Sequence, residues 1–189
     1  MGCNGAGESD DLARQVFRAR PLNPGVRRLN LAASMTPTKR SATLGRLKYE
    51  PDYRQYVTDL VHKGAKINLR LNCESDDQID RLLPFAEKVW RGRVRHFKAF
   101  REFAVSDLLE LLNEFLDCGE EDPPQVTVKQ LRQMLRTPFS MTFFLDGNDQ
   151  DILAFEISGG DDYRLREHCI TVYFDEDGNV TNGEAVALF

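Results

Sequence analysis

The chain has 189 residues, of which 41% are hydrophobic and 29% are charged, and its formal net charge is −5. These apolar residues suffice for one core of ordinary domain size, and the net charge is too low for a disordered chain. No run approaches the roughly 18 apolar residues of a membrane span, and no apolar secretory segment opens the chain, so we expect a cytoplasmic protein that does not bind a membrane.

The first segment, residues 1–43, is rich in Gly, Asn, Pro, Ser and Arg and has no core periodicity. Seven basic residues against three acidic residues give this segment a charge of +4, so residues 44–189 carry −9. We therefore expect a flexible basic N-terminal tail before a single folded domain at residues 44–189. The acidic domain repels nucleic acid at long range, which makes nucleic acid an unfavoured partner.

Three strands are predicted at the start of the domain, at residues 44–49, 53–61 and 65–73. The third has the clearest alternation, because Leu69 and the residues two positions away are apolar, whereas those between them are Lys, Asn and Arg. Such alternation predicts a strand with one buried face.

A helical segment follows these strands. Ser75 followed by Gln78 is a capping-box pattern, and apolar residues at three- and four-residue steps predict a helical region up to about residue 116. Gly92 is expected to divide this region in two, because glycine is a poor helix former. Thr127 with Gln130 is a second capping-box pattern, which predicts a short helix to about residue 135.

Four further strands are predicted at residues 140–145, 152–158, 169–174 and 184–189. Asp-Gly dipeptides follow the first and the third of them, where glycine accepts the positive φ of a hairpin turn. The element order predicts an α+β domain with two antiparallel β meanders, of about three and four strands, joined by a helical layer. One merged sheet packed on the helices is the alternative that this order leaves open.

The residue types that support metal or acid–base chemistry are few and scattered. His62, His96 and His168 lie in different predicted elements, and the four cysteines include no CxxC pair. We therefore expect reduced thiols, no metal site and no cofactor. His168 beside Cys169 resembles a nucleophile with its base, but consecutive side chains on a strand point to opposite faces. We predict no catalytic residue, and His168 is kept as the one candidate binding residue.

A basic stretch at residues 91–101 combines clustered arginines with aromatic residues, a combination that can bind a nucleic-acid strand. Val94, Phe97 and Phe100 have helical spacing, however, which favours a buried apolar stripe with the charges on the solvated side. Three acidic residues further along offer intramolecular partners for these charges, namely Asp107, Glu110 and Glu114.

Several short motifs resemble those of one bacterial family. They are LGRL at 44–47, KGAK at 63–66, REFAVSDLLEL at 101–111, EHCI at 167–170 and DEDG at 175–178. Over residues 44–189 the chain is similar to the bacterial domain-of-unknown-function family 2262. The resemblance implies the fold of that family and a bacterial setting, and it implies no reaction.

These observations favour a non-enzymatic binding or accessory protein of the bacterial cytoplasm that acts through contact with another protein. Toxin-neutralising immunity proteins include small acidic α+β proteins, and the analogy with them rests on size, charge and fold class alone. The alternative is a hydrolase or other small-molecule enzyme whose polar residues converge only in the folded structure. A third hypothesis is a nucleic-acid-binding module that uses the basic tail and residues 91–101.

Overall fold

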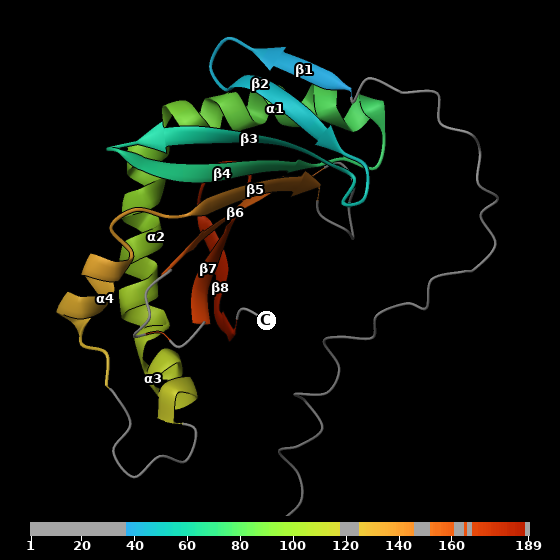
Figure 1. Cartoon of the computed structure of the whole chain (residues 1–189). Coiled ribbons are helices and arrows are strands. Elements are labelled where there is room, and N and C mark those ends of the chain that lie inside the picture. Colours follow the sequence, from blue (N-terminus) through green and yellow to red (C-terminus); the bar gives the residue numbers. More distant parts are fainter. Residues whose placement is uncertain (1–36, 118–124, 146–151, 161–164, 166–167, 188–189) are drawn as a thin grey trace, which may run out of the picture. The chain divides into compact units, whose positions relative to one another are not determined.

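The structure is a computed structural model, and it describes residues 37–117, 125–145, 152–160, 165 and 168–187. Within these residues four strands are followed by four helices and then by four more strands (Figure 1). The predicted α+β class is therefore confirmed.

The eight strands form one continuous sheet in sequence order. Every neighbouring pair is antiparallel except β4 and β5, which are parallel. The expectation of two separate meanders of about three and four strands is therefore wrong, and the two halves are merged. The strands are β1 (Thr38–Ser41), β2 (Gly45–Glu50), β3 (Gln55–His62), β4 (Ala65–Asn72), β5 (Ser140–Leu145), β6 (Leu153–Gly159), β7 (His168–Phe174) and β8 (Val180–Ala187).

The pairing of β4 with β5 is the reason for the merger. Leu69 lies opposite Met141, and Leu71 lies opposite Phe143. All four side chains are fully buried. Joining the two strands therefore lets both apolar faces pack on the same helices, and the helices between β4 and β5 supply the crossover that a parallel pair needs.

Four helices lie between the two halves of the sheet. α1 contacts β4 and β5, and α2 contacts β7 and β8, so the two long helices cover one face of the sheet (Figure 1). None of the helices in the described residues is long and apolar enough to cross a bilayer. The helices are α1 (Asp76–Arg91), α2 (Arg93–Asp107), α3 (Leu109–Asp117) and α4 (Val128–Met134).

The helix boundaries follow the sequence signals in most places. The predicted division at Gly92 is confirmed, since α1 ends before this residue and α2 begins after it. The capping box of Thr127 and Gln130 at the start of α4 is also confirmed. Ser75, in contrast, makes no side-chain capping bond at α1. Gln78 Oε1 instead accepts a hydrogen bond from the amide of the residue before Ser75, at 2.6 Å.

The core lies between the helices and the covered face of the sheet. The predicted register of the third strand is confirmed, because Leu69 is fully buried and its neighbour Arg70 is exposed. Phe155 of β6 stacks on Phe174 of β7 with ring centroids 4.7 Å apart. Phe85 of α1 meets the Phe155 ring at a centroid distance of 5.9 Å. Aromatic contacts thus join α1 to the C-terminal strands.

One predicted core residue is on the surface. Val94 was expected in a buried stripe with Phe97 and Phe100, but 62% of Val94 is exposed, while Phe97 and Phe100 are buried. Because Gly92 ends α1, α2 begins as a separate helix, and its buried side includes His96 and Ala104 instead. The apolar stripe of α1 therefore does not continue in phase into α2.

Two strands differ from their predicted bounds. β1 lies at Thr38–Ser41, within the segment that the sequence assigns to the tail, and it pairs with β2 along its whole length. It has no large apolar residue, so no hydrophobic pattern marks it. The last strand begins at Val180 rather than at Glu184, and a register shift at Tyr173/Phe174 accompanies this earlier start.

Candidate functional site

The face of the sheet opposite α1 and α2, called the outer face below, carries polar residues from neighbouring strands. Arg70, Thr142, Glu156, Tyr173 and Asn182 are register partners from β4 to β8. Successive side chains on a strand alternate between faces, so these five residues lie on the same face as one another. The row places Glu156 directly between Thr142 and Tyr173.

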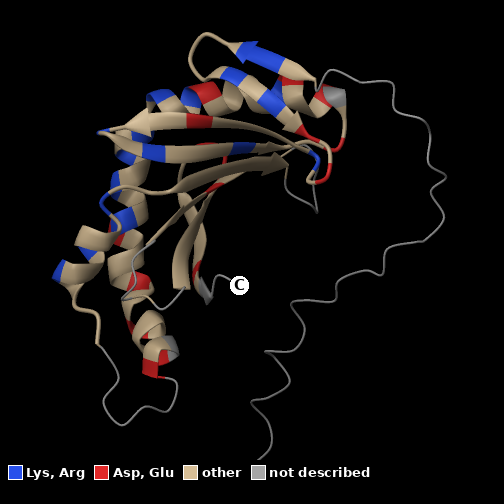
Figure 2. Ribbon diagram, viewed as in Figure 1, with Lys and Arg blue, Asp and Glu red and all other residues tan. Residues whose placement is uncertain are grey.

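Charge is divided unevenly between the two halves of the sheet. Residues 37–73, which form β1–β4, contain eight lysines and arginines against three acidic residues. In the described residues from 140 onward, there are five acidic residues and no lysine or arginine. Figure 2 shows the blue of Lys and Arg on the first strands and on the helices rather than on β5–β8. The C-terminal half therefore presents a negative potential.

Glu156 is the acidic residue at the centre of this half. It is half-buried on β6, and burial raises the pKa of its carboxyl, while a hydrogen bond with Thr142 opposes the rise. The carboxylate of Glu184 on β8 also raises the pKa of Glu156. The site thus holds one carboxyl that keeps its proton to a higher pH than an exposed glutamate does.

Tyr173 connects β7 to β8 on the outer face. Its hydroxyl donates a hydrogen bond to Glu184 Oε1. Burial, followed by this bond to Glu184, raises the pKa of Tyr173. The phenol therefore stays protonated and acts as a donor. On the neighbouring register pair of β6 and β7, the hydroxyls of Ser158 and Thr171 are hydrogen-bonded to each other at 2.9 Å.

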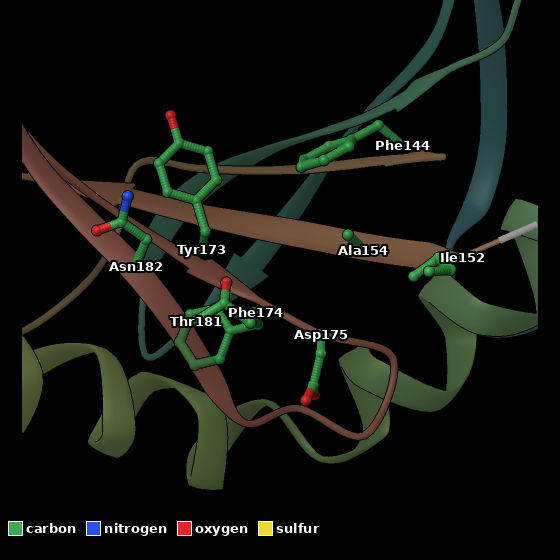
Figure 3. A pocket seen from close by; sticks show the side chains of 8 residues that line it. All are labelled: Phe144, Ile152, Ala154, Tyr173, Phe174, Asp175, Thr181 and Asn182. Atoms are coloured by element: carbon green, nitrogen blue, oxygen red, sulfur yellow. The ribbon is translucent and has the colours of Figure 1, made fainter. Parts of the chain in front are cut away.

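A cavity of about 390 Å³ lies beside Tyr173. Its apolar lining comes from Phe144, Ile152 and Ala154 of the β5–β6 side, and Tyr173 and Asn182 supply polar groups (Figure 3). Sites for small ligands or single inserted side chains combine apolar walls with a few polar groups in this way. Phe174, Asp175 and Thr181 complete the lining.

Asp175 at the edge of this cavity has a structural role. Its Oδ1 accepts hydrogen bonds from the amides of Asp177 and Asn179, at 3.0 and 2.8 Å. These bonds and the Asn179 side-chain bond hold the pKa of Asp175 below its usual value, although burial opposes them. Asp175 therefore fixes the turn between β7 and β8. We define the acidic site as Glu156, Tyr173 and Glu184 with the adjacent cavity.

The candidate that the sequence singled out lies elsewhere. His168 is at the first position of β7, opposite Ala187, and is not among the residues that line the cavity. Cys169 follows it on the same strand and is buried, and burial raises the pKa of the Cys169 thiol. Consecutive strand positions point to opposite faces, which is the geometry that argues against a His–Cys dyad.

The other two histidines are also separate from the acidic site. His62 Nδ1 accepts a hydrogen bond from Arg93 Nε at 3.1 Å, so these two residues join β3 to α2. His96 is buried against Phe155, with ring centroids 5.2 Å apart. Among the residues that the structure describes, no three His, Cys, Asp or Glu side chains form a group that could hold a metal ion.

The basic stretch at residues 91–101 is largely engaged within the protein. Arg91 forms an ion pair with Glu87 at 3.1 Å, and the Arg93 guanidinium lies 4.9 Å from the centre of the Trp90 ring. Arg95 donates to the backbone oxygen of residue 177 at 3.1 Å. In the described part of the chain no ion pair joins this stretch to Asp107, Glu110 or Glu114, which the sequence offers as partners.

The acidic site was missed because its members come from three strands. Glu156, Tyr173 and Glu184 are adjacent only through strand register. One signal could have found Glu156, since it is the single charged residue in the strand Leu153–Gly159. A lone acid among apolar residues marks a buried or partly buried carboxyl.

Comparison with known proteins places the chain in a family without assigning it a reaction. No curated protein and no solved structure matches the sequence significantly. Residues 41–184 match the family described as uncharacterized protein conserved in bacteria (DUF2262), and this agrees with the resemblance drawn from the short motifs. The match covers most of the chain, and the protein therefore belongs to the DUF2262 family.

Proposed function

We propose that this protein is a non-enzymatic binding protein of the bacterial cytoplasm, and that its acidic site binds a basic protein partner. The observation that carries the proposal is the charge of the C-terminal half-sheet. Two of its acids, Glu156 and Glu184, lie in the acidic site, and its described residues include no lysine or arginine. A surface of one sign steers a partner of the opposite sign and suppresses binding of partners with the same sign.

The chemistry of the acidic site fits a partner with a cationic side chain next to an apolar one. Glu184 already accepts a hydrogen bond from Tyr173, and its second oxygen offers a further acceptor for Lys or Arg. The cavity of about 390 Å³ beside Tyr173, with Phe144 and Ile152 in its wall, has room for one large apolar side chain. Anchors of this kind carry most of the energy of an interface.

The proposal is tested with two matched substitutions. Ile152, 42% exposed, lines the cavity, and Val61, 70% exposed, lies on β3 away from the cavity. Ile152→Arg places a cation in the acidic site, whereas Val61→Arg places one on the basic half. Both residues are exposed, so neither change disturbs the core.

The immobilised full-length chain is used to capture basic proteins from a bacterial lysate, and each captured protein is then purified and titrated directly. We expect a basic partner whose affinity falls at least about tenfold with Ile152→Arg, stays unchanged with Val61→Arg and weakens at high salt. Equal affinity of both variants for every captured protein would contradict the proposal.

A small-molecule enzyme is the second candidate, and the raised pKa of Glu156 is the observation that favours it. A carboxyl that keeps its proton to a higher pH can act as a general acid, with a second carboxylate such as Glu184 in a different environment. Hydrolysis of chromogenic ester, phosphodiester or glycoside substrates would support this candidate if Glu156→Gln abolished it. Turnover that is insensitive to Glu156→Gln would count against it.

A further inference from the structure

A second cavity, of about 320 Å³, lies on the helix side of the sheet. It is enclosed by the end of α1, the start of α2 and the turn between β7 and β8. It shares no residue with the cavity of the acidic site. Its lining consists of Lys88, Val89, Gly92, Arg95, His96, Glu176, Asp177 and Gly178.

His96 is the buried polar group of this cavity. Only 4% of the residue is exposed, and its Nδ1 has no hydrogen-bond partner among the residues that the structure describes. The ring meets Phe155 and Phe174 edge-on, at centroid distances of 5.2 and 6.2 Å, so neither phenylalanine can satisfy the nitrogen. A buried nitrogen without a partner is unfavourable, and such an atom marks a place for a ligand.

The two glycines of the cavity pack closely against the imidazole ring. A Cβ atom at Gly178 would lie 2.9 Å from His96 Nδ1 and 2.4 Å from its Cε1. A Cβ atom at Gly92 would lie 3.2 Å from His96 Nε2. A larger residue at Gly178 would press on the ring, so this side of the imidazole faces glycine backbone alone.

Two cations act on His96. α2 begins after Gly92 without a side-chain cap and without an acidic residue in its first turn, and the C-terminal end of α1 meets it at the same glycine. Burial, followed by the charges of Arg95 and Lys88, lowers the pKa of His96 to about 4. Lys88 and Arg95 favour an anion beside the neutral imidazole, and the exposed Glu176 and Asp177 of the same lining oppose it.

The charged groups around the ring come from each packed element. α1 contributes Lys88, α2 contributes Arg95, and the β7–β8 turn contributes Glu176 and Asp177, which are exposed. Arg95 is held over the cavity by its bond to the backbone oxygen of Asp177 at 3.1 Å. From the sheet, β6 and β7 contribute only the two phenylalanines.

We propose that this cavity binds a small oxyanion of the phosphate class, with Arg95 and Lys88 as the charged contacts and His96 as the buried donor. Guanidinium and ammonium groups are strong donors to phosphate oxygens. Nδ1–H of the imidazole can donate to the anion in the neutral ring and in the imidazolium. The anion can be free phosphate or the phosphoryl group of a small molecule, because both present the same oxygens.

An anion beside His96 also favours the imidazolium. Binding therefore raises the pKa of His96 from its low value in the empty cavity, and phosphate binds more tightly as the pH falls. The dissociation constant of inorganic phosphate is expected to be lower at about pH 5 than at about pH 6, a range in which phosphate itself stays mostly the monoanion. This direction distinguishes the site from one formed by Arg95 and Lys88 alone.

The full-length chain is titrated with inorganic phosphate at constant ionic strength, with sodium chloride as the reference. The His96 Cε1 proton is followed by NMR, and the thermal midpoint is measured in parallel. We expect a saturable shift of the His96 resonance and a higher midpoint with phosphate. An equal effect of chloride and phosphate, or no saturation, would overturn the proposal.

Two exposed cations on α2 give a matched pair of variants. Arg95→Gln removes a lining cation, whereas Lys98→Gln removes one that does not line the cavity. We expect about a tenfold weaker phosphate affinity for the first and no change for the second. Equal affinities would refute the assignment. A parallel titration with glycerol 3-phosphate identifies the source, since tighter binding than phosphate assigns the site to an organic phosphoryl group, and weaker binding assigns it to the free anion.

Discussion

Substitution of Gly178 by alanine tests the packing of His96 against the β7–β8 turn. Gly178 has a φ of +80°, and Gly64 in the β3–β4 turn has a φ of +82°. An L-residue in this conformation costs about 1–2 kcal/mol, so both glycine-to-alanine changes carry this cost. They differ in their surroundings, because a Cβ at Gly64 meets nothing within 4 Å, whereas one at Gly178 lies 2.4 Å from His96 Cε1.

The His96 ring cannot move away from the new methyl group at low cost. Phe155 and Phe174 lie against it, and both are almost fully buried. Overpacking of a filled site costs about 1–3 kcal/mol. We therefore expect Gly178→Ala to lower the free energy of unfolding by about 2–5 kcal/mol and Gly64→Ala by about 1–2 kcal/mol.

Urea denaturation of the full-length chain followed by circular dichroism measures both costs, and a double-mutant cycle isolates the contact. In a His96→Ala background, Gly178→Ala should cost only the conformational strain, which gives a coupling energy of about 1–3 kcal/mol. Equal costs for the two glycines, or additivity of His96→Ala with Gly178→Ala, would refute the placement of His96 beside the turn.

Three further predictions follow from the sheet and the helices. Leu69→Ala should lower the unfolding free energy by about 2–5 kcal/mol because Leu69 is fully buried. Arg70→Ala should lower it by less than about 0.5 kcal/mol. Reversed costs in urea denaturation would mean that the strand register is wrong by one residue. The pKa of Glu156 is raised in the folded state, so the protonated carboxyl contributes to the free energy of unfolding below its ordinary pKa of 4.5. This contribution is lost as the pH rises through the pKa of the folded state. Glu156→Gln should therefore stabilise the protein at pH values above that pKa and have no stabilising effect in acid, and a pH-independent difference in unfolding free energy would contradict this. Because Arg93 and Arg95 are engaged within the protein, the chain without its basic N-terminal tail should bind DNA no more tightly than about 10⁻⁴ M at physiological salt, as measured by fluorescence anisotropy. Micromolar binding that is lost on reversing these two charges would show that the stretch is a nucleic-acid surface.

The parts of the fold that could be predicted from the sequence are those with local signals. The alternation around Leu69 identifies β4, Gly92 divides the helical region, and Thr127 with Gln130 marks the start of α4. Each signal depends on residues a few positions apart, which a single sequence displays directly. β1 had no such signal, because its four residues are Thr, Lys, Arg and Ser.

The merger of the sheet could not be deduced in the same way. Asn68 pairs with Ser140, and a helical segment separates them in the chain, so neither strand's own pattern specifies the partner. Antiparallel hairpins have short turns that identify both strands, whereas a parallel pair depends on how the crossover packs. The acidic site had the same obstacle, since Glu156, Tyr173 and Glu184 meet only when the order and register of β6–β8 are known.

The order of the strands places the basic and the acidic parts of the sequence in different halves of the sheet. Because the sheet follows sequence order from β1 to β8, the basic residues 37–73 form one half and the acidic C-terminal strands form the other. On the outer face, the change of sign occurs where Arg70 faces Thr142 and Thr142 faces Glu156. A partner that carries both charges would therefore be oriented as well as attracted.

Strand alternation separates the two proposed sites. Tyr173 points to the acidic site on the outer face, and the next residue, Phe174, packs against His96 on the helix side. The two sites are divided by the sheet itself, so a substitution at Ile152 changes the surroundings of one and a substitution at Arg95 those of the other. Their ligands also differ in sign, and for this reason a loss of basic-partner binding and a loss of phosphate binding can be measured independently in the same protein.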